Sequence, residues 1–134
     1  MLKYIVIGAL VVAGLGVLGC GGAKAGASSN SGAGALVSYE ELSSKLAKKE
    51  QFVLLDVRTQ EEFASGHIEG AVLLPYDEVE KKAAGLLPDK EKAIIVYCRS
   101  GRRSAIAAES LRGLGYKDVR DFGGVNRWQG QLVK

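Results

Sequence analysis

From Leu36 onward, apolar residues fall alternately into strand-length runs and helix-like patterns. Four short runs have the length and apolar content of β-strands, at residues 52–57, 71–74, 93–97 and 119–122. The run at 93–97 is the most strand-like, because Ile94, Ile95 and Val96 follow one another. Continuous apolar strands are expected where helices cover both faces of a sheet. Strands and helices that alternate in this way predict an α/β fold with a parallel sheet.

The helices predicted between these runs begin and end at recognisable residues. Ser38-Tyr39-Glu40-Glu41 is a capping-box signature, in which Ser38 caps a helix and the Glu41 side chain reaches back. Thr59-Gln60-Glu61-Glu62 repeats the signature and opens a short helix that ends at Gly66. Two further helices are predicted, at 77–84 and at 103–114, the second followed by Gly115.

The N-terminal residues have the pattern of a secretory signal. Lys3 precedes an apolar run from Tyr4 to Leu18, and Gly19-Cys20-Gly21-Gly22 follows it. This ending resembles a bacterial lipobox, in which the cysteine is lipidated, although Val17 and Leu18 depart from the usual residues. Three outcomes stay open: lipidation of Cys20 after cleavage, an ordinary cleaved signal, or an uncleaved membrane span. The span is possible because the segment from Tyr4 to Gly22 is barely as long as the ~20 residues that a membrane helix needs.

The chain is therefore predicted to have three parts: a signal peptide or membrane anchor at 1–20, a flexible Gly/Ala/Ser linker at 21–35, and a folded domain at 36–134. The linker has too little apolar surface to offset the entropy lost on ordering. We expect an exported protein in the periplasm or at the cell surface. It would be held at the membrane by lipidated Cys20 or by an uncleaved N-terminal helix, and the folded domain would be a monomer.

Charge and composition exclude several partners and cofactors. A net charge of +3 is too small to indicate nucleic-acid binding, which needs many phosphate contacts. One histidine and two cysteines cannot supply a His/Cys metal site. No cofactor is expected. The clustering of Arg99, Arg102 and Arg103 is more informative, because it favours a site for a small anion.

The most informative segment is Tyr97-Cys98-Arg99-Ser100-Gly101-Arg102-Arg103-Ser104. Cys98 follows the strongest predicted strand, and a helix begins about five residues later. Gly101 allows the intervening loop to curl around the sulfur and to direct N–H groups at it. The positive end of the helix would add to this stabilisation of a sulfur anion. The alternative is a buried, inert cysteine at the end of a strand.

The folded part resembles the rhodanese family in three segments that occur in the family's order. The first segment contains Asp56-Val57-Arg58, Glu62-Phe63, Gly66-His67-Ile68-Glu69-Gly70-Ala71 and Pro75. The second is the active loop that starts at Cys98, and the third contains Gly123-Gly124 and Trp128. The resemblance implies five parallel strands flanked by helices on both faces.

The resemblance also implies the roles of the site residues. Cys98 would be catalytic and would carry sulfur as a persulfide. The substrate-binding residues would be Arg99, Ser100, Gly101, Arg102, Arg103 and Arg58. The positions of three further residues, apart from the resemblance, favour structural roles near the site. Asp56 and Arg58 follow a strand end near Cys98, where an ion pair between them is favoured over substrate binding by Arg58. For His67, a hydrogen bond that organises the loop is favoured over proton donation. Trp128 is expected to pack, with a substrate platform as the alternative.

The predicted function is transfer of sulfur from a donor such as thiosulfate to cyanide or a thiol, the reaction of a thiosulfate sulfurtransferase. Cysteine-dependent phosphatases of related fold use a Cys-x5-Arg loop. Here Ser104 occupies the sixth position after Cys98 and Arg103 comes one residue too early, which disfavours a phosphatase or an arsenate reductase. A non-catalytic module that binds a partner protein is the remaining alternative.

Overall fold

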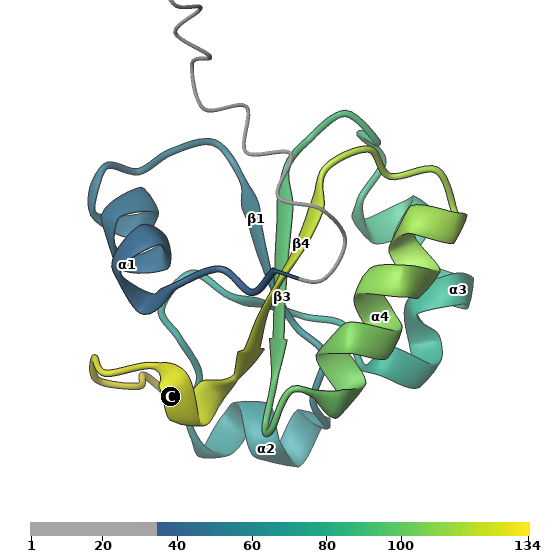
Figure 1. The fold of residues 1–134 in the computed structure, drawn as a ribbon. Helices are drawn as coiled ribbons and strands as arrows, with labels where there is room; N and C mark the ends of the chain where they lie inside the picture. The colour runs from purple at the N-terminus through teal and green to yellow at the C-terminus, as the bar shows by residue number, and fades with distance from the viewer. Residues whose placement is uncertain (1–34) are drawn as a thin grey trace, which may run out of the picture. The chain divides into compact units, whose positions relative to one another are not determined.

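A four-stranded parallel sheet forms the centre of the computed structural model, which describes residues 35–134 (Figure 1). The strands are β1 (Val53–Asp56), β2 (Val72–Leu73), β3 (Ile94–Cys98) and β4 (Val119–Gly124), in the spatial order β2-β1-β3-β4. Every neighbouring pair is parallel. The carboxyl ends of the strands therefore meet at one edge of the sheet, where α/β proteins bind their ligands.

Helices cover both faces of the sheet, as predicted (Figure 1). The α-helices are α1 (Tyr39–Ala47), α2 (Gln60–Ser65), α3 (Val79–Leu86) and α4 (Arg102–Gly113), and 3-10 turns span η1 (Tyr76–Glu78) and η2 (Val125–Arg127). α3 and α4 lie against one face, α1 lies against the other, and α2 lies near the carboxyl ends of the strands. The α/β prediction is thus confirmed.

The prediction of five strands is wrong for the part of the chain that the structure describes, which contains four. Val37 lies where a further strand would extend the sheet. Its N–H donates to the carbonyl of Asp121 at the outer edge of β4, at 2.8 Å. Ser38 then caps α1, so the chain turns away after this single backbone bond. One bond is too few to continue the ladder.

The central strand supplies side chains to two apolar layers because successive residues point to opposite faces. All five residues of β3 are buried. Ile94, Val96 and Cys98 belong to the layer packed under α3 and α4, together with Ala107, Ala108 and Leu111 of α4. Ile95 and Tyr97 belong to the layer under α1, together with Leu42 and Phe122. Cys98 is therefore placed at the carboxyl end of the most buried strand.

The two predicted capping boxes differ in the structure. Thr59 and Glu62 form both hydrogen bonds of the motif at the start of α2. Ser38 accepts from the Glu41 N–H at 3.1 Å, but Glu41 does not complete the box. Its carboxylate instead forms an ion pair with Arg120 of β4, and this contact holds the pKa of Glu41 below its usual value. The ion pair attaches α1 to β4.

Local backbone geometry sets the start of α3 and the end of α4. The helix predicted at 77–84 begins later, at Val79, because Tyr76–Glu78 forms a 3-10 turn after Pro75. At the end of α4, Gly115 has φ +96°, a left-handed conformation suited to glycine directly after a helix. The predicted stop at this residue is confirmed.

Within residues 35–134, no helix is both long enough and apolar enough to cross a membrane. The predicted signal or anchor, and all of the predicted linker but its last residue, lie outside the described residues.

Gly124 at the end of β4 provides a test of how closely the loop after Cys98 packs on the sheet. A Cβ on Gly124 would lie 2.6 Å from the carbonyl oxygen of Arg99 and 2.9 Å from Cα of Ser100. Its φ of −90° suits any residue, so the constraint is one of space. We expect Gly124→Ala to lower the free energy of unfolding by about 1–3 kcal/mol, measured by urea denaturation.

Gly85→Ala in α3 is the matched control, because no atom lies within 4 Å of the added Cβ. It should raise the free energy of unfolding by roughly 0.5–1 kcal/mol. Wild-type stability in Gly124→Ala would show that the loop does not need this close contact.

Candidate active site

Three residues, 99–101, connect β3 to α4, and they fold back over the side chain of Cys98. Gly101 has φ +108°, which other residues rarely adopt, and this conformation allows the turn. The Gly101 N–H then donates a hydrogen bond to Cys98 Sγ, at 2.9 Å. The sequence predicted such a loop with an amide directed at the sulfur.

The environment of the Cys98 sulfur is buried but partly polar. The side chain has no exposed surface and packs in the apolar layer beneath α4. Sγ also lies 3.5 Å from the hydroxyl oxygen of Ser104. Burial alone agrees with an inert cysteine. The Gly101 amide and the Ser104 hydroxyl beside the sulfur favour a functional one.

Ser104 is a residue of this site that the sequence prediction did not assign. It is fully buried in the first turn of α4. Its position, followed by Ala107, Ala108 and Leu111 at spacings of three, four and seven, marks it as part of the buried helix face. A polar residue on such a face is the signal that would have identified it.

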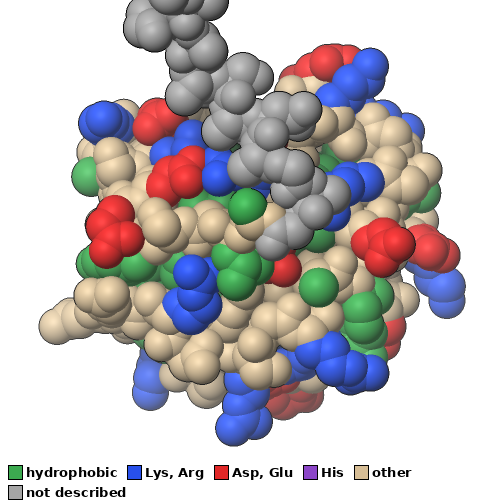
Figure 2. All heavy atoms as spheres, in the orientation of Figure 1, with side chains coloured by type: hydrophobic (Ala, Val, Ile, Leu, Met, Phe, Trp, Pro, Cys, Tyr) green, Lys and Arg blue, Asp and Glu red, His purple; other side chains and the backbone are tan. Residues whose placement is uncertain are grey.

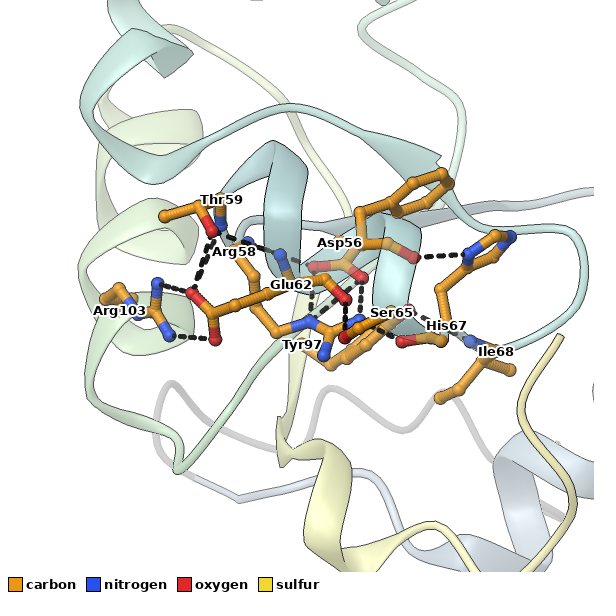
Figure 3. A network of polar contacts seen from close by, with 11 residues as sticks. Asp56, Arg58, Thr59, Glu62, Ser65, His67, Ile68, Tyr97 and Arg103 are labelled. Atoms are coloured by element: carbon orange, nitrogen blue, oxygen red, sulfur yellow. Dashed lines mark hydrogen bonds and ion pairs between the residues drawn. The ribbon is translucent and has the colours of Figure 1, made fainter. Parts of the chain in front are cut away.

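Arg103, also in the first turn of α4, is bound to α2 (Figure 3). Its two terminal nitrogens donate to the Glu62 carboxylate at 2.7 and 2.9 Å. Glu62 also accepts from the backbone N–H of Thr59, at 3.3 Å. These hydrogen bonds, that from Arg103 above all, lower the pKa of Glu62 to about 2. The capping box of α2 therefore also anchors the start of α4.

Arg58 forms the ion pair with Asp56 that the sequence favours over a substrate-binding role. It is 5% exposed, and its Nε and Nη2 donate to the fully buried carboxylate of Asp56 at 3.0 and 2.7 Å. Nη2 also donates to the carbonyl of Gly66 at 2.7 Å. With Nε and Nη2 engaged in this way, the structure favours the ion pair for Arg58 over substrate binding.

Tyr97 adds a second anchor for the same connection between α2 and β2. Its hydroxyl accepts from the Ile68 N–H at 3.1 Å, and the Arg58 guanidinium lies over its ring at 5.6 Å from the centroid. Burial, together with the nearby Asp56 carboxylate, raises the pKa of Tyr97. The hydroxyl thus stays protonated and serves as a structural group.

His67 and Trp128 both have structural contacts. His67 Nδ1–H donates to the carbonyl of Phe63 at 2.9 Å, and the two rings stack at 3.7 Å between centroids. The Trp128 ring packs edge-on against Tyr39 at 5.2 Å and Phe122 at 6.5 Å. These contacts favour loop organisation for His67 and packing for Trp128, rather than proton donation or substrate binding.

Arg99, Ser100 and Arg102 are exposed on the active loop and at the start of α4. Among residues 35–134, neither Arg99 nor Arg102 has a carboxylate within ion-pair distance. Figure 2 shows Lys and Arg side chains along the lower edge of the molecule, the end where α2 and the turn from β3 into α4 lie. Within these residues, two positive charges without an ion-pair partner therefore lie on the loop after Cys98 and at the start of α4.

Comparison with known proteins identifies the family. The family described as "Rhodanese-like domain" matches residues 38–131, almost all of the described chain. The chain belongs to the rhodanese-like domain family. The resemblance predicted from the sequence is confirmed.

Several relatives of this rhodanese-like domain carry names that describe sulfur transfer. Thiosulfate sulfurtransferase PspE of Escherichia coli (strain K12) is 39% identical over 71 residues, which are 53% of this chain and 68% of PspE. Putative sulfurtransferase YtwF of Bacillus subtilis (strain 168) is 36% identical over 95 residues, 71% of this chain and 90% of YtwF. The chain spans only 23% of Adenylyltransferase and sulfurtransferase UBA4 of Candida albicans, at 37% identity.

Solved structures agree with this assignment. The structure described as "rhodanese with anions from E. coli" has a TM-score of 0.58 and 36% identity, and the match covers 61% of this chain and 96% of that one. The human single-domain sulfurtransferase TSTD1 has a TM-score of 0.60 and 34% identity, with 66% of this chain and 88% of that one covered.

The Glu62–Arg103 pair predicts how the stability of this rhodanese-like domain depends on pH. Both side chains are partly exposed, at 26% and 20%, so we expect Glu62→Gln to lower the free energy of unfolding by only about 1 kcal/mol near neutral pH. The pKa of Glu62 falls from 4.5 to about 2 on folding. The stabilisation is therefore fully present above pH 4.5 and is lost as the pH falls toward 2.

Urea denaturation at about pH 7 and about pH 3 measures this effect, and the gap between wild type and Glu62→Gln should narrow at the lower pH. Glu61→Gln is the control, because Glu61 is exposed on the same helix and does not contact Arg103. It should change the free energy of unfolding by less than about 0.5 kcal/mol. A gap that is the same at both pH values would contradict the proposed charge interaction.

Proposed function

We propose that this rhodanese-like domain is a thiosulfate sulfurtransferase that carries the transferred sulfur as a persulfide on Cys98. The observation that carries the proposal is the position of Cys98 Sγ at the end of β3, where the Gly101 N–H donates to it at 2.9 Å. A donor aimed at a sulfur stabilises its anionic form, which is the nucleophile. The names of PspE, YtwF and TSTD1 support sulfur transfer as the reaction.

The reaction proceeds in two steps with Cys98 as the nucleophile. The Cys98 thiolate attacks the outer sulfur of thiosulfate, the S–S bond of the donor breaks, and sulfite leaves with the bonding electron pair. The cysteine is now a persulfide anion. In the second step, cyanide or a thiolate attacks the outer sulfur, the S–S bond to Sγ breaks, and the electron pair returns to Cys98. The cycle needs no metal, cofactor or external redox partner.

The active loop supports this chemistry with charge and amides. The exposed guanidinium groups of Arg99 and Arg102 attract a doubly charged donor to the loop. Gly101 supplies an amide to the sulfur, and the neighbouring Ser100 is exposed beside it. The predicted binding role of Arg103 is indirect here, because Glu62 occupies its guanidinium. Arg103 would fix the start of α4 rather than bind the donor.

The same geometry argues against a phosphatase. In that reaction, an arginine at the end of the loop must be free to bind the phosphoryl oxygens. Arg103 comes one residue too early in the loop, and its two terminal nitrogens are bound to Glu62. The small loop suits one sulfur anion better than a phosphate with its oxygens.

The decisive test is the conversion of thiosulfate and cyanide to thiocyanate. We expect turnover by the wild type and none by Cys98→Ser, because the serine hydroxyl cannot form a persulfide. Incubation with thiosulfate alone should add the mass of one sulfur atom to the wild-type peptide that contains Cys98. A wild type with neither turnover nor added sulfur would support the binding-module alternative.

A phosphotyrosine analogue serves as the control substrate in the same samples. Hydrolysis of this analogue in place of sulfur transfer would support the phosphatase alternative.

The sequence also supports a proposal about location: the domain is exported and is held at the membrane through lipidated Cys20, with an uncleaved N-terminal helix as the alternative anchor. Mass spectrometry of the mature N-terminus distinguishes the outcomes. We expect a diacylglyceryl group on Cys20, and we expect Cys20→Ser to release the protein from the membrane fraction. An intact Met1 in the membrane fraction would indicate the uncleaved helix instead.

A further inference from the structure

The hydroxyl of Ser104 is the one polar side-chain group within reach of the Cys98 sulfur among the hydrogen bonds of residues 35–134. Ser104 has no exposed surface and lies 3.5 Å from Sγ, measured from its Oγ. Its neighbours on the buried face of α4 are Ala107, Ala108 and Leu111. A serine on this face loses its hydration without gaining apolar contacts, so its hydrogen bonds must compensate.

When Cys98 is a thiol, it donates a hydrogen bond to Ser104, and Ser104 in turn donates to the backbone. The Cys98 S–H donates to Ser104 Oγ, and the Ser104 O–H donates to the carbonyl of Gly101 at 3.0 Å. The carbonyl of Gly123 lies 3.4 Å from the same oxygen. Ser104 thus accepts from the thiol and donates to the loop.

Loss of the thiol proton reverses the direction of the first hydrogen bond. A thiolate can only accept, whereas a hydroxyl has one proton and rotates freely about its C–O bond. Turning that proton from Gly101 to Sγ would give the sulfur anion a second donor besides the Gly101 N–H. The Gly101 carbonyl would keep a partner, since it also accepts from the Ala105 N–H at 3.2 Å. The Gly101 carbonyl therefore keeps a hydrogen bond after the rotation.

We propose that Ser104 is a catalytic residue whose hydroxyl donates a hydrogen bond to the Cys98 thiolate. This inference rests on the proposed sulfurtransferase function and adds a residue to it. In the first step, the bond stabilises the attacking thiolate. In the second step, the S–S bond to Sγ breaks and the electron pair returns to Sγ, so the same bond stabilises the departing thiolate. Ser104 gives up no proton in either step.

A purely structural role for Ser104 makes a different prediction. If the hydroxyl served only to hold the Gly101 carbonyl, its removal would weaken the fold and leave the sulfur's acid–base behaviour unchanged. The two roles separate when stability and thiol reactivity are measured on the same variant.

The experiment follows alkylation of Cys98 by iodoacetamide as a function of pH, with the Cys98 peptide quantified by mass spectrometry. Only the thiolate reacts at an appreciable rate. We expect Ser104→Ala to slow alkylation by roughly tenfold near neutral pH, the effect of one charge-assisted hydrogen bond, and to move the midpoint of the profile to higher pH. The rates of the two proteins should converge at high pH.

Two further variants serve as controls. Ser110→Ala removes a hydroxyl from the same helix at a partly exposed position and should match the wild type throughout. Ser104→Thr keeps a hydroxyl and should keep the wild-type pH profile. A Thr variant whose profile moves to higher pH than that of the wild type would overturn the proposal, and this comparison can be made even if Ser104→Ala does not fold.

The outcomes distinguish this inference from the proposed function. An alkylation profile of Ser104→Ala identical to wild type overturns the role of Ser104, whether or not the wild type transfers sulfur. A shifted profile supports the role, and it does so even if thiosulfate turnover is absent and the proposed substrate is wrong. With turnover present, Ser104→Ala should also slow thiocyanate release from the preformed persulfide.

Discussion

The chain must turn from β3 into α4 within three residues while the Gly101 N–H donates a hydrogen bond to the Cys98 sulfur. Several other parts of the domain make this turn possible. Gly101 allows it by adopting a positive φ. Gly124 allows it from the neighbouring strand, because any side chain there would collide with the backbone of Arg99. The parallel sheet makes the arrangement possible, since it brings the ends of β3 and β4 together.

Polar contacts attach the rest of the carboxyl end of the sheet to this loop. α2 contains no buried residue, so apolar packing contributes little to its position. It is held instead by the ion pair between Glu62 and Arg103 and by the hydrogen bond from the Arg58 guanidinium to the Gly66 carbonyl. The Asp56–Arg58 pair is buried, and removal of one partner would leave an uncompensated charge in the interior. Electrostatics therefore organise this end of the molecule, whereas apolar layers organise the sheet.

Most of the fold could be predicted from the sequence because its signals are local. The apolar run that became β3, the capping box at Thr59 and the stop at Gly115 each depend on a few adjacent residues. The fifth strand could not be judged in this way. Within residues 35–134, its absence depends on Ser38 turning the chain into α1 directly after Val37 has paired with β4.

The site was predictable in part for the same reason. The amide on Cys98 follows from the spacing of Cys98 and Gly101 within one loop. The partners of Arg58 and Arg103 depend on contacts between separate elements, and a cluster of arginines does not reveal which of them are already neutralised. The contact of Ser104 with the sulfur depends on its place on the buried face of α4, which the loop motif alone does not indicate.

The lack of buried side chains in α2 has a consequence for how the domain diversifies. Substitutions on α2 that retain Thr59 and Glu62 leave both apolar layers intact, because the helix contributes to neither. The surface next to the sulfur can therefore change its charge and shape at little cost to folding. The apolar layers that stabilise the fold and the exposed surface of α2 are therefore separate parts of one small domain.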